Sequence, residues 1–215
     1  STVLDQGNTE SFTFDTTTND NQLTAAIGGV DSDGDPRQDV LLRDDTLGVG
    51  ETLIIDILGG DVNNGDDFFG LAVTAASGIT SRENMIGLRA EGDDDTLSTP
   101  EVVLSSFDNT GFVGDQSSTG TNLHLDSLTR LAIRRNATNQ FEGLYDNGAG
   151  FVSVGTVDTS SGWTTPGAAV GLWMGNGRES GPITVQADNL RVIPEPASGL
   201  LLGLGGIALF VRRRR

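Results

Sequence analysis

Three aspartates at alternate positions form the pattern in this chain that best suits metal binding. Asp31, Asp33 and Asp35 are separated by one serine and one glycine, and carboxylates spaced in this way can wrap a hard cation such as Ca²⁺. The segment is not an EF-hand loop, because its glycine falls at the fourth position and its twelfth residue is Leu42 rather than glutamate. The spacing makes calcium a candidate cofactor, and a solvated acidic turn is the alternative.

The chain has few of the residues that nucleophilic catalysis and zinc binding require. The chain holds one histidine, His124, and no cysteine. A serine triad needs a histidine as its base, and structural zinc sites draw on cysteine and histidine. We therefore expect His124 to be an exposed residue without a catalytic role, and we expect neither a structural zinc site nor a disulfide.

Three aromatic residues are candidates for stacking on sugar rings: Trp163, Trp173 and Tyr145. Trp163 lies in the polar stretch 160–166. Trp173 sits in an alternating apolar run, which places its ring on one face of an expected strand. The alternative for all three is packing in the core or at the rim of a sheet.

The charge of the chain is strongly negative, at −17 overall. Residues 1–193 hold nine basic and 29 acidic residues and so carry a net charge of −20. Nucleic-acid binding needs a basic face, so we expect no nucleic-acid partner. An acidic surface keeps an exported protein soluble and attracts divalent cations.

Short apolar runs recur between turn-rich segments, and no long helical periodicity appears in residues 1–193. This pattern is typical of an all-β sandwich. The expected strands cover 11–14, 40–42, 52–58, 68–75, 85–90, 102–107, 128–135, 141–145, 151–157, 168–174 and 183–193.

The connections between these strands can be predicted in part. The five polar residues 136–140 suit a hairpin loop, and 146–150 suit a second hairpin whose glycines supply positive φ. In the last strand, Val185 and Ala187 are out of phase with Leu190 and Val192, so we expect a bulge near residues 188–189. The Gly/Ser/Thr-rich stretch 108–122 reads as a long surface loop.

The C-terminal half of this strand pattern resembles the closing half of concanavalin A-like (laminin G-like) jelly rolls. The segments that carry the resemblance are Leu-Ala-Ile-Arg-Arg (131–135), Phe-Glu-Gly-Leu-Tyr-Asp-Asn-Gly (141–148), Phe-Val-Ser-Val-Gly (151–155), Ala-Val-Gly-Leu-Trp (169–173) and Ala-Asp-Asn-Leu-Arg-Val (187–192). The resemblance covers roughly residues 128–193. It implies a jelly-roll β-sandwich for residues 1–193 and is weak for function.

The resembled fold includes glycosidases that use a Glu-x-Asp-x-x-Glu strand, in which two carboxyl groups share one face. No such motif occurs here. Asp56 stands alone in an apolar strand, and the glutamates that lie near other expected strands are scattered: Glu51, Glu83, Glu101 and Glu142. We therefore expect no enzyme activity, with a diverged glycoside hydrolase or lyase as the alternative.

The last 22 residues consist of Pro194, Glu195 and Pro196, an uncharged apolar run at 197–211, and four arginines at 212–215. A helix of that run spans about 22 Å, which is short for a hydrocarbon core of about 30 Å. Arginines stay on the cytoplasmic side, so the body would lie outside. The alternative is a buried C-terminal helix of a soluble domain.

This layout resembles the PEP-CTERM sorting signal of Gram-negative bacteria. The resemblance implies that exosortase, a membrane-embedded transpeptidase-like enzyme, recognises Pro194, Glu195 and Pro196 and cleaves near them. It also implies export and an association with exopolysaccharide or biofilm matrix. An export leader should precede such a chain, and residues 1–5 do not look like one, so we expect it to have been removed or truncated.

The sequence thus predicts an all-β jelly-roll domain at 1–193 and a sorting signal with a C-terminal hydrophobic helix at 194–215. We expect an exported, non-catalytic protein of the cell envelope or extracellular matrix. Its expected partners are exosortase, the inner membrane through a transient contact of the C-terminal helix, and exopolysaccharide. An adhesion module that meets another protein through a sheet edge is a further alternative.

Overall fold

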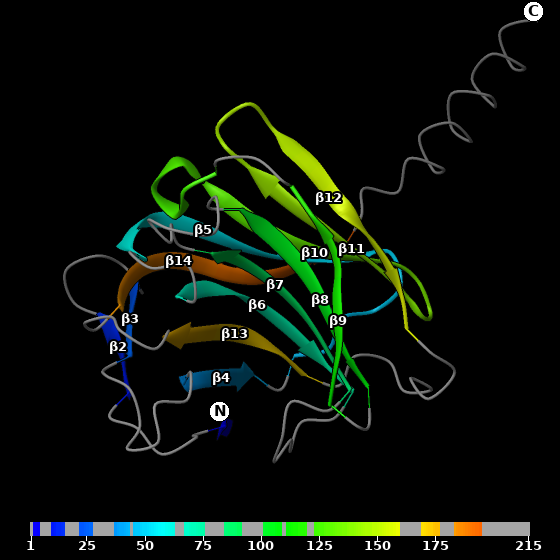
Figure 1. Cartoon of the computed structure of the whole chain (residues 1–215), viewed down its shortest axis with the longest axis horizontal. Coiled ribbons are helices and arrows are strands. Elements are labelled where there is room, and N and C mark those ends of the chain that lie inside the picture. Colours follow the sequence, from blue (N-terminus) through cyan, green and yellow to red (C-terminus); the bar gives the residue numbers. More distant parts are fainter. Residues whose placement is uncertain are drawn as a thin grey trace, which may run out of the picture.

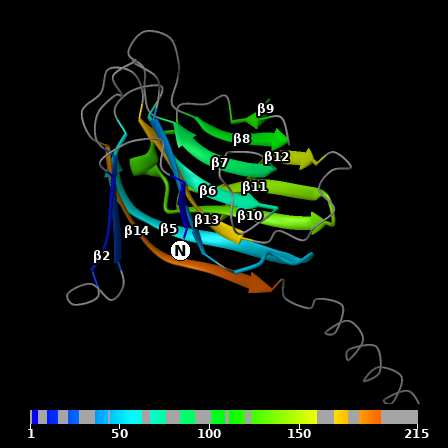
Figure 2. The same cartoon turned by 90° about the horizontal axis from the view of Figure 1, so that it is seen from below.

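The computed structural model describes residues 2–4, 10–15, 22–27, 37–43, 45–62, 67–75, 84–91, 101–108, 111–119, 123–159, 169–176 and 183–194. In these segments the chain forms two antiparallel sheets that lie face to face (Figures 1 and 2). The expected all-β sandwich is confirmed. Among the described residues no helix is long and apolar enough to cross a membrane, and the expected C-terminal helix lies outside them.

Each sheet holds seven of the described strands. Sheet A has the order β1 (Thr2–Leu4), β4 (Arg37–Arg43), β13 (Ala169–Asn176), β6 (Phe68–Thr74), β7 (Met85–Glu91), β8 (Val102–Asp108) and β9 (Gly111–Ser118). Sheet B has the order β12 (Phe151–Asp158), β11 (Gln140–Asp146), β10 (Arg130–Ala137), β5 (Glu51–Asp61), β14 (Ile183–Pro194), β3 (Gln22–Ile27) and β2 (Glu10–Asp15).

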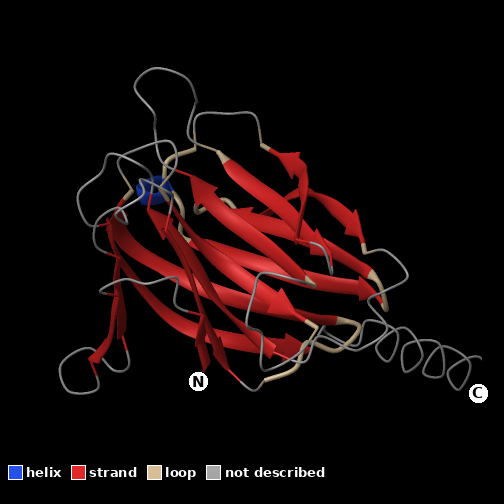
Figure 3. Ribbon diagram, turned by 60° about the horizontal axis from the view of Figure 1, so that its bottom comes forward, coloured by secondary structure: helices blue, strands red, loops and turns tan. Residues whose placement is uncertain are grey.

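The order of strands brings distant parts of the chain together. β13 pairs with β4 and β6, and β14 pairs with β5 and β3. The short 3₁₀ helix Leu125–Ser127, blue in Figure 3, precedes β10. Because late strands fill central positions in both sheets, neither sheet is complete until the C-terminal part of the body has been added.

Alternating side chains build the core between the sheets. Leu131 and Ile133 of β10 are fully buried in that core, whereas Arg130 and Arg134 are only half-buried. Ala132 packs in a separate small cluster with Ile54 and Leu144. Successive side chains of a strand point to opposite faces, and the burial of β10 follows this alternation.

The hairpin between β10 and β11 is tighter than expected. Ala137 pairs with Gln140, so only Thr138 and Asn139 remain in the turn. The five-residue loop prediction was wrong because polar residues continue the ladder past Arg135 through a register shift. The next hairpin is as expected, since Gly148 and Gly150 have φ of 97° and 105°.

The bulge expected in the last strand is confirmed. The register of β14 against β5 shifts between Asp188 and Arg191, and Asn189 has a φ of 54°. Leu190 and Val192 consequently pack against the core. A second shift, between Gln186 and Ala187, was not expected.

The stretch 108–122 is not a long loop. β9 spans Gly111–Ser118 and pairs with β8, with register shifts at two places. These shifts break the alternation that would have indicated a strand. The strands β1 and β3 were also not predicted from the sequence. β9 lies at the edge of sheet A and meets β12 of sheet B, where the Ser117 hydroxyl donates to the Val154 carbonyl at 2.6 Å.

Candidate functional site

Six of the nine residues proposed from the sequence for metal binding, sugar stacking or sorting lie outside the described part of the chain. They are Asp31, Asp33, Asp35, Trp163, Glu195 and Pro196. Within the described residues there is no group of three or more histidine, aspartate or glutamate side chains that could hold a metal ion. Calcium binding and the sugar-stacking role of Trp163 therefore stay predictions. Pro194 is described, and it ends β14 opposite Glu51.

Two of the three aromatic candidates are described, and they lie in different sheets. Trp173 of β13 is only 2% exposed, so its ring is not available for stacking on a sugar, which agrees with the packing alternative. Tyr145 of β11 is half-buried and packs against the core between the sheets. The structure does not bring Trp173 and Tyr145 together. His124 is exposed, as expected.

Trp173 belongs to an aromatic cluster on the outer face of sheet A. Its ring meets Phe68 and Phe107 edge-on, with centroid distances of 4.5 and 5.6 Å. Glycine at position 87 of β7 makes room for the indole, since a Cβ there would lie 2.3 Å from a ring carbon of Trp173. The Trp173 ring thus provides an aromatic surface over which the Arg89 side chain lies.

The guanidinium of Arg89 packs over Trp173, with its central carbon 5.3 Å from the centroid of the Trp173 ring. Its Nε donates to Glu91 at 2.7 Å, and its Nη1 donates to Asp115 at 3.1 Å. Nη1 also donates to Ser105, whose hydroxyl in turn donates to Asp115 at 2.7 Å. We call Arg89, Glu91, Ser105 and Asp115 the Arg89 cluster.

Exposure differs sharply within the Arg89 cluster. The side chains of Arg89 and Glu91 are 11% and 18% exposed, whereas that of Asp115 is 47% exposed. Burial raises the pKa of Glu91 above its ordinary value; Arg89 opposes this rise, and Asp115 and Glu101 add to it. Asp115 is therefore the member of the cluster that a ligand in solvent would meet first.

Phe112 of β9 adds an exposed ring beside the cluster. It is 58% exposed, and its ring centroid lies 5.2 Å from that of Phe107. Phe107 and Phe112 are direct cross-strand partners, as are Ser105, two residues before Phe107 on β8, and Asp115. An exposed aromatic ring and an exposed carboxylate thus lie side by side on the outer face of sheet A.

Sequence reasoning missed Phe112 and Asp115 because it placed both in a loop. The available signal was the apolar pair at 112–113 inside a polar stretch, but the shifted register of β9 hid the period of two. The remote partners of Asp115 could not be identified without the pairing of β7, β8 and β9.

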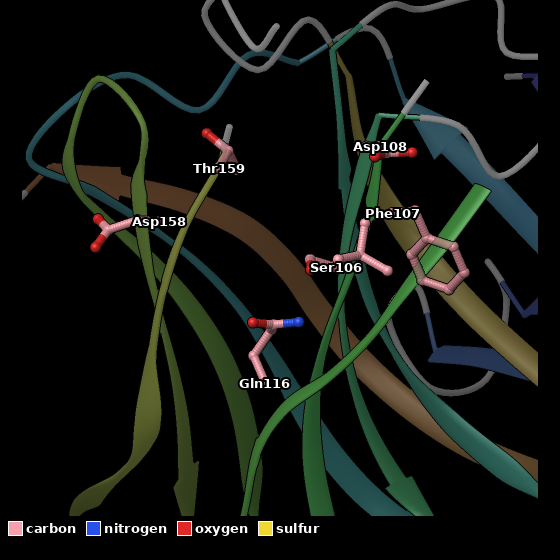
Figure 4. A pocket seen from close by; sticks show the side chains of 7 residues that line it. Ser106, Phe107, Asp108, Gln116, Asp158 and Thr159 are labelled. Atoms are coloured by element: carbon pink, nitrogen blue, oxygen red, sulfur yellow. The ribbon is translucent and has the colours of Figure 1, made fainter. Parts of the chain in front are cut away.

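A small pocket lies at the open edge between the sheets (Figure 4). It has a volume of about 130 Å³, and Ser106, Phe107, Asp108, Val113, Gln116, Asp158 and Thr159 line it. The Asp158 carboxylate accepts from Gln140, and the Thr159 hydroxyl donates to the Asn139 carbonyl. The pocket is small beside ordinary ligand sites.

The C-terminal residues contain a protein-sorting motif. Residues 192–215 match the PEP-CTERM protein-sorting motif. The PEP-CTERM motif indicates that the protein is exported. It starts inside β14, so its first three residues are part of sheet B. A search among curated proteins finds no match to the chain.

Solved structures resemble this chain in fold. The seed lectin of Lotus tetragonolobus superposes with a TM-score of 0.50 at 8% identity, covering 90% of this chain and 94% of the lectin. Galectin-Ib of Xenopus laevis gives 0.45 at 10% identity, over 72% of this chain and 99% of the galectin.

The exoplasmic/lumenal domain of VIP36, in its Ca²⁺/Man3GlcNAc-bound form, gives a TM-score of 0.45 at 13% identity over 87% of each chain. These neighbours are legume lectin-like and galectin-like jelly rolls, and the jelly-roll resemblance is confirmed. At such low identity the likeness shows the fold alone.

Proposed function

We propose that this exported protein binds saccharides of the cell envelope or extracellular matrix through the outer face of sheet A, without chemical turnover. The observation that carries the proposal is the exposed pair Phe112 and Asp115, which is backed by Arg89, Phe107 and Trp173. The match to the PEP-CTERM motif supports the location. The lectin fold of the Lotus tetragonolobus protein is consistent with sugar binding.

The chemistry of the pair suits a pyranose ring. The C–H face of a sugar is apolar and can cover an aromatic ring such as Phe112, while the neighbouring carboxylate of Asp115 accepts hydrogen bonds from ring hydroxyls. Charge-assisted hydrogen bonds of this kind are stronger than neutral ones. The bonds from Arg89 and Ser105 hold the Asp115 side chain in place before a ligand arrives.

A glycan array and a polysaccharide pull-down with the purified full chain test this proposal. We expect the chain to bind at least one matrix polysaccharide, and we expect Phe112→Ala to lower the affinity about tenfold, because the stacking surface is lost. Phe151→Ala is the matched control. Phe151 is also an exposed phenylalanine on an edge strand, but it belongs to sheet B.

Equal losses in the two variants would contradict the proposed site, and a chain that binds no polysaccharide would leave only a structural role.

The rival function is a diverged glycoside hydrolase or lyase. Within the Arg89 cluster, Glu91, whose pKa is raised, and Asp115 are the two carboxylates that could form an acid–base pair. Both are engaged by Arg89, which favours binding without turnover. Release of reducing sugar from a bound polysaccharide would instead support the enzyme.

Two further parts of the proposal concern partners. Exosortase would recognise Pro194, Glu195 and Pro196 and process the chain after a transient contact of the C-terminal segment with the inner membrane. Calcium would bind at Asp31, Asp33 and Asp35 and add to the stability of the body. Carboxylate oxygens at this spacing suit that cation.

A further inference from the structure

We infer that the Arg89 cluster selects saccharides that carry no negative charge and discriminates against uronate-rich polymers. This inference rests on the proposed function, and it names the chemical class of ligand for the same surface. It follows from how the charges of the cluster are already paired and from which of them solvent can reach.

The guanidinium of Arg89 has no nitrogen left over for an anionic sugar. Nε and Nη2 both face Glu91, at 2.7 and 2.6 Å from its Oε1. Nη1 faces Ser105 and Asp115. A uronate carboxylate is best held by two parallel N–H groups of an arginine. Arg89 could offer that fork only by giving up a bond to Glu91, Ser105 or Asp115.

The charge that solvent meets at this surface is negative. The cluster contains one guanidinium and two carboxylates, and its most exposed member is Asp115. It belongs to a body with a net charge of −20. A uronate approaching Phe112 would be repelled by the Asp115 carboxylate and by the field of the whole body. A neutral sugar avoids that repulsion, and an ammonium group on a glucosamine gains an attraction.

The test compares three sets of oligosaccharides of matched length on one array: neutral hexoses, glucosamine oligomers and uronate oligomers. The full chain is applied at low salt and again at high salt. We expect neutral and glucosamine oligomers to bind and uronate oligomers to bind at least about tenfold more weakly at low salt. Raising the salt should weaken glucosamine binding and narrow the gap between neutral and uronate oligomers, because salt screens exposed charges.

Asp115→Asn removes the exposed carboxylate and should strengthen uronate binding severalfold relative to neutral binding. Asp45→Asn is the matched control, because it changes the net charge by the same amount. Asp45 is 48% exposed and pairs with an arginine, as Asp115 does. Uronate oligomers that bind as tightly as neutral ones would overturn the inference while leaving the proposed function intact. Equal effects of the two variants would also overturn it, because the whole body and not the cluster would then set the preference. A chain that binds none of the three sets would reject the proposed function and the inference together.

Discussion

At the scale of single residues, the buried carboxylate of Asp146 shows how this cysteine-free chain secures a turn. The residue is 1% exposed, and its Oδ1 accepts the N–H groups of Gly148 and Gly150 at 2.7 and 3.0 Å. Its Oδ2 accepts from Arg130. A buried carboxylate is tolerated when its oxygens are satisfied in this way. The β11–β12 hairpin therefore depends on one aspartate.

The ionisation of Asp146 should make this contribution depend on pH. Burial works to raise the pKa of Asp146, but the hydrogen bonds from Arg130, Gly148 and Gly150 and the charge of Arg130 lower it overall. Since the folded pKa lies below the unfolded value of about 3.9, the stabilisation is present above that pH and is lost as the pH falls through the folded value.

We expect Asp146→Asn to lower the free energy of unfolding by about 2 kcal/mol at pH 7, and by progressively less as the pH falls below the unfolded pKa of about 3.9. Urea denaturation of the variant and the wild type at several pH values measures this difference. Asp126→Asn, at an exposed aspartate in the 3₁₀ helix, is the control. A difference that stays constant from pH 7 to pH 3 would contradict the role given to ionisation.

At the scale of elements, bulges decide which side chains reach the core. The shift between Asp188 and Arg191 restores the phase of β14, and Asn189 takes the left-handed conformation that this requires. Its side-chain amide donates to Asp56 at 2.9 Å, and its backbone N–H is bonded to Asp188 at 2.6 Å. Asparagine adopts this conformation more readily than most residues because its short polar side chain can bond locally.

Substitutions at Asn189 should separate backbone strain from the lost hydrogen bond. Asn189→Gly keeps the conformation and loses only the bond to Asp56, so we expect a cost of less than about 1 kcal/mol in unfolding free energy. Asn189→Val also places a β-branched residue at positive φ, so we expect a cost of about 2 kcal/mol or more. Chemical denaturation gives both values, and equal costs would show that the bulge is not strained.

At the scale of the whole molecule, the sorting motif and the sandwich share residues. β14 is a central strand of sheet B, and its last residues pair with β5 as far as Pro194 opposite Glu51. The PEP-CTERM match begins at residue 192. Removal of residues 191–194 would strip the end of β5 of a partner strand. Processing of the tail must therefore spare β14 if the body is to stay intact.

We expect the exported protein to end at residue 194 or later and to lack the arginines at 212–215. Intact-mass spectrometry of the protein recovered from the envelope and the medium of a host with exosortase measures this end. Glu195→Gln should leave the arginines attached, whereas Leu58→Ala, at a residue 54% exposed on β5 and outside the matched motif, should be processed normally. A secreted chain that retains the arginines would count against processing, and an end before residue 194 would count against the role of β14.

Sequence patterns determined the features that depend on local physics. Short apolar runs between turn-rich segments located most of the strands, as in β5 and β10, because strands that bury a sheet face need apolar residues there. The glycines at 148 and 150 and the phase break near 189 were also readable, since positive φ and a change of phase both leave a trace in the local sequence. The sorting motif is read from the order of its residues, so it needs no fold to be recognised.

Tertiary structure alone decided which distant side chains meet. β9 escaped detection because its shifted register hides the alternation, and with it went Phe112 and Asp115. The burial of Trp173 depends on its packing with Phe68 and Phe107 across strands far apart in the chain. Arg89, Ser105 and Asp115 converge because β7, β8 and β9 pair in one particular register. Such contacts depend on pairing between remote segments, and no short stretch of sequence contains that information.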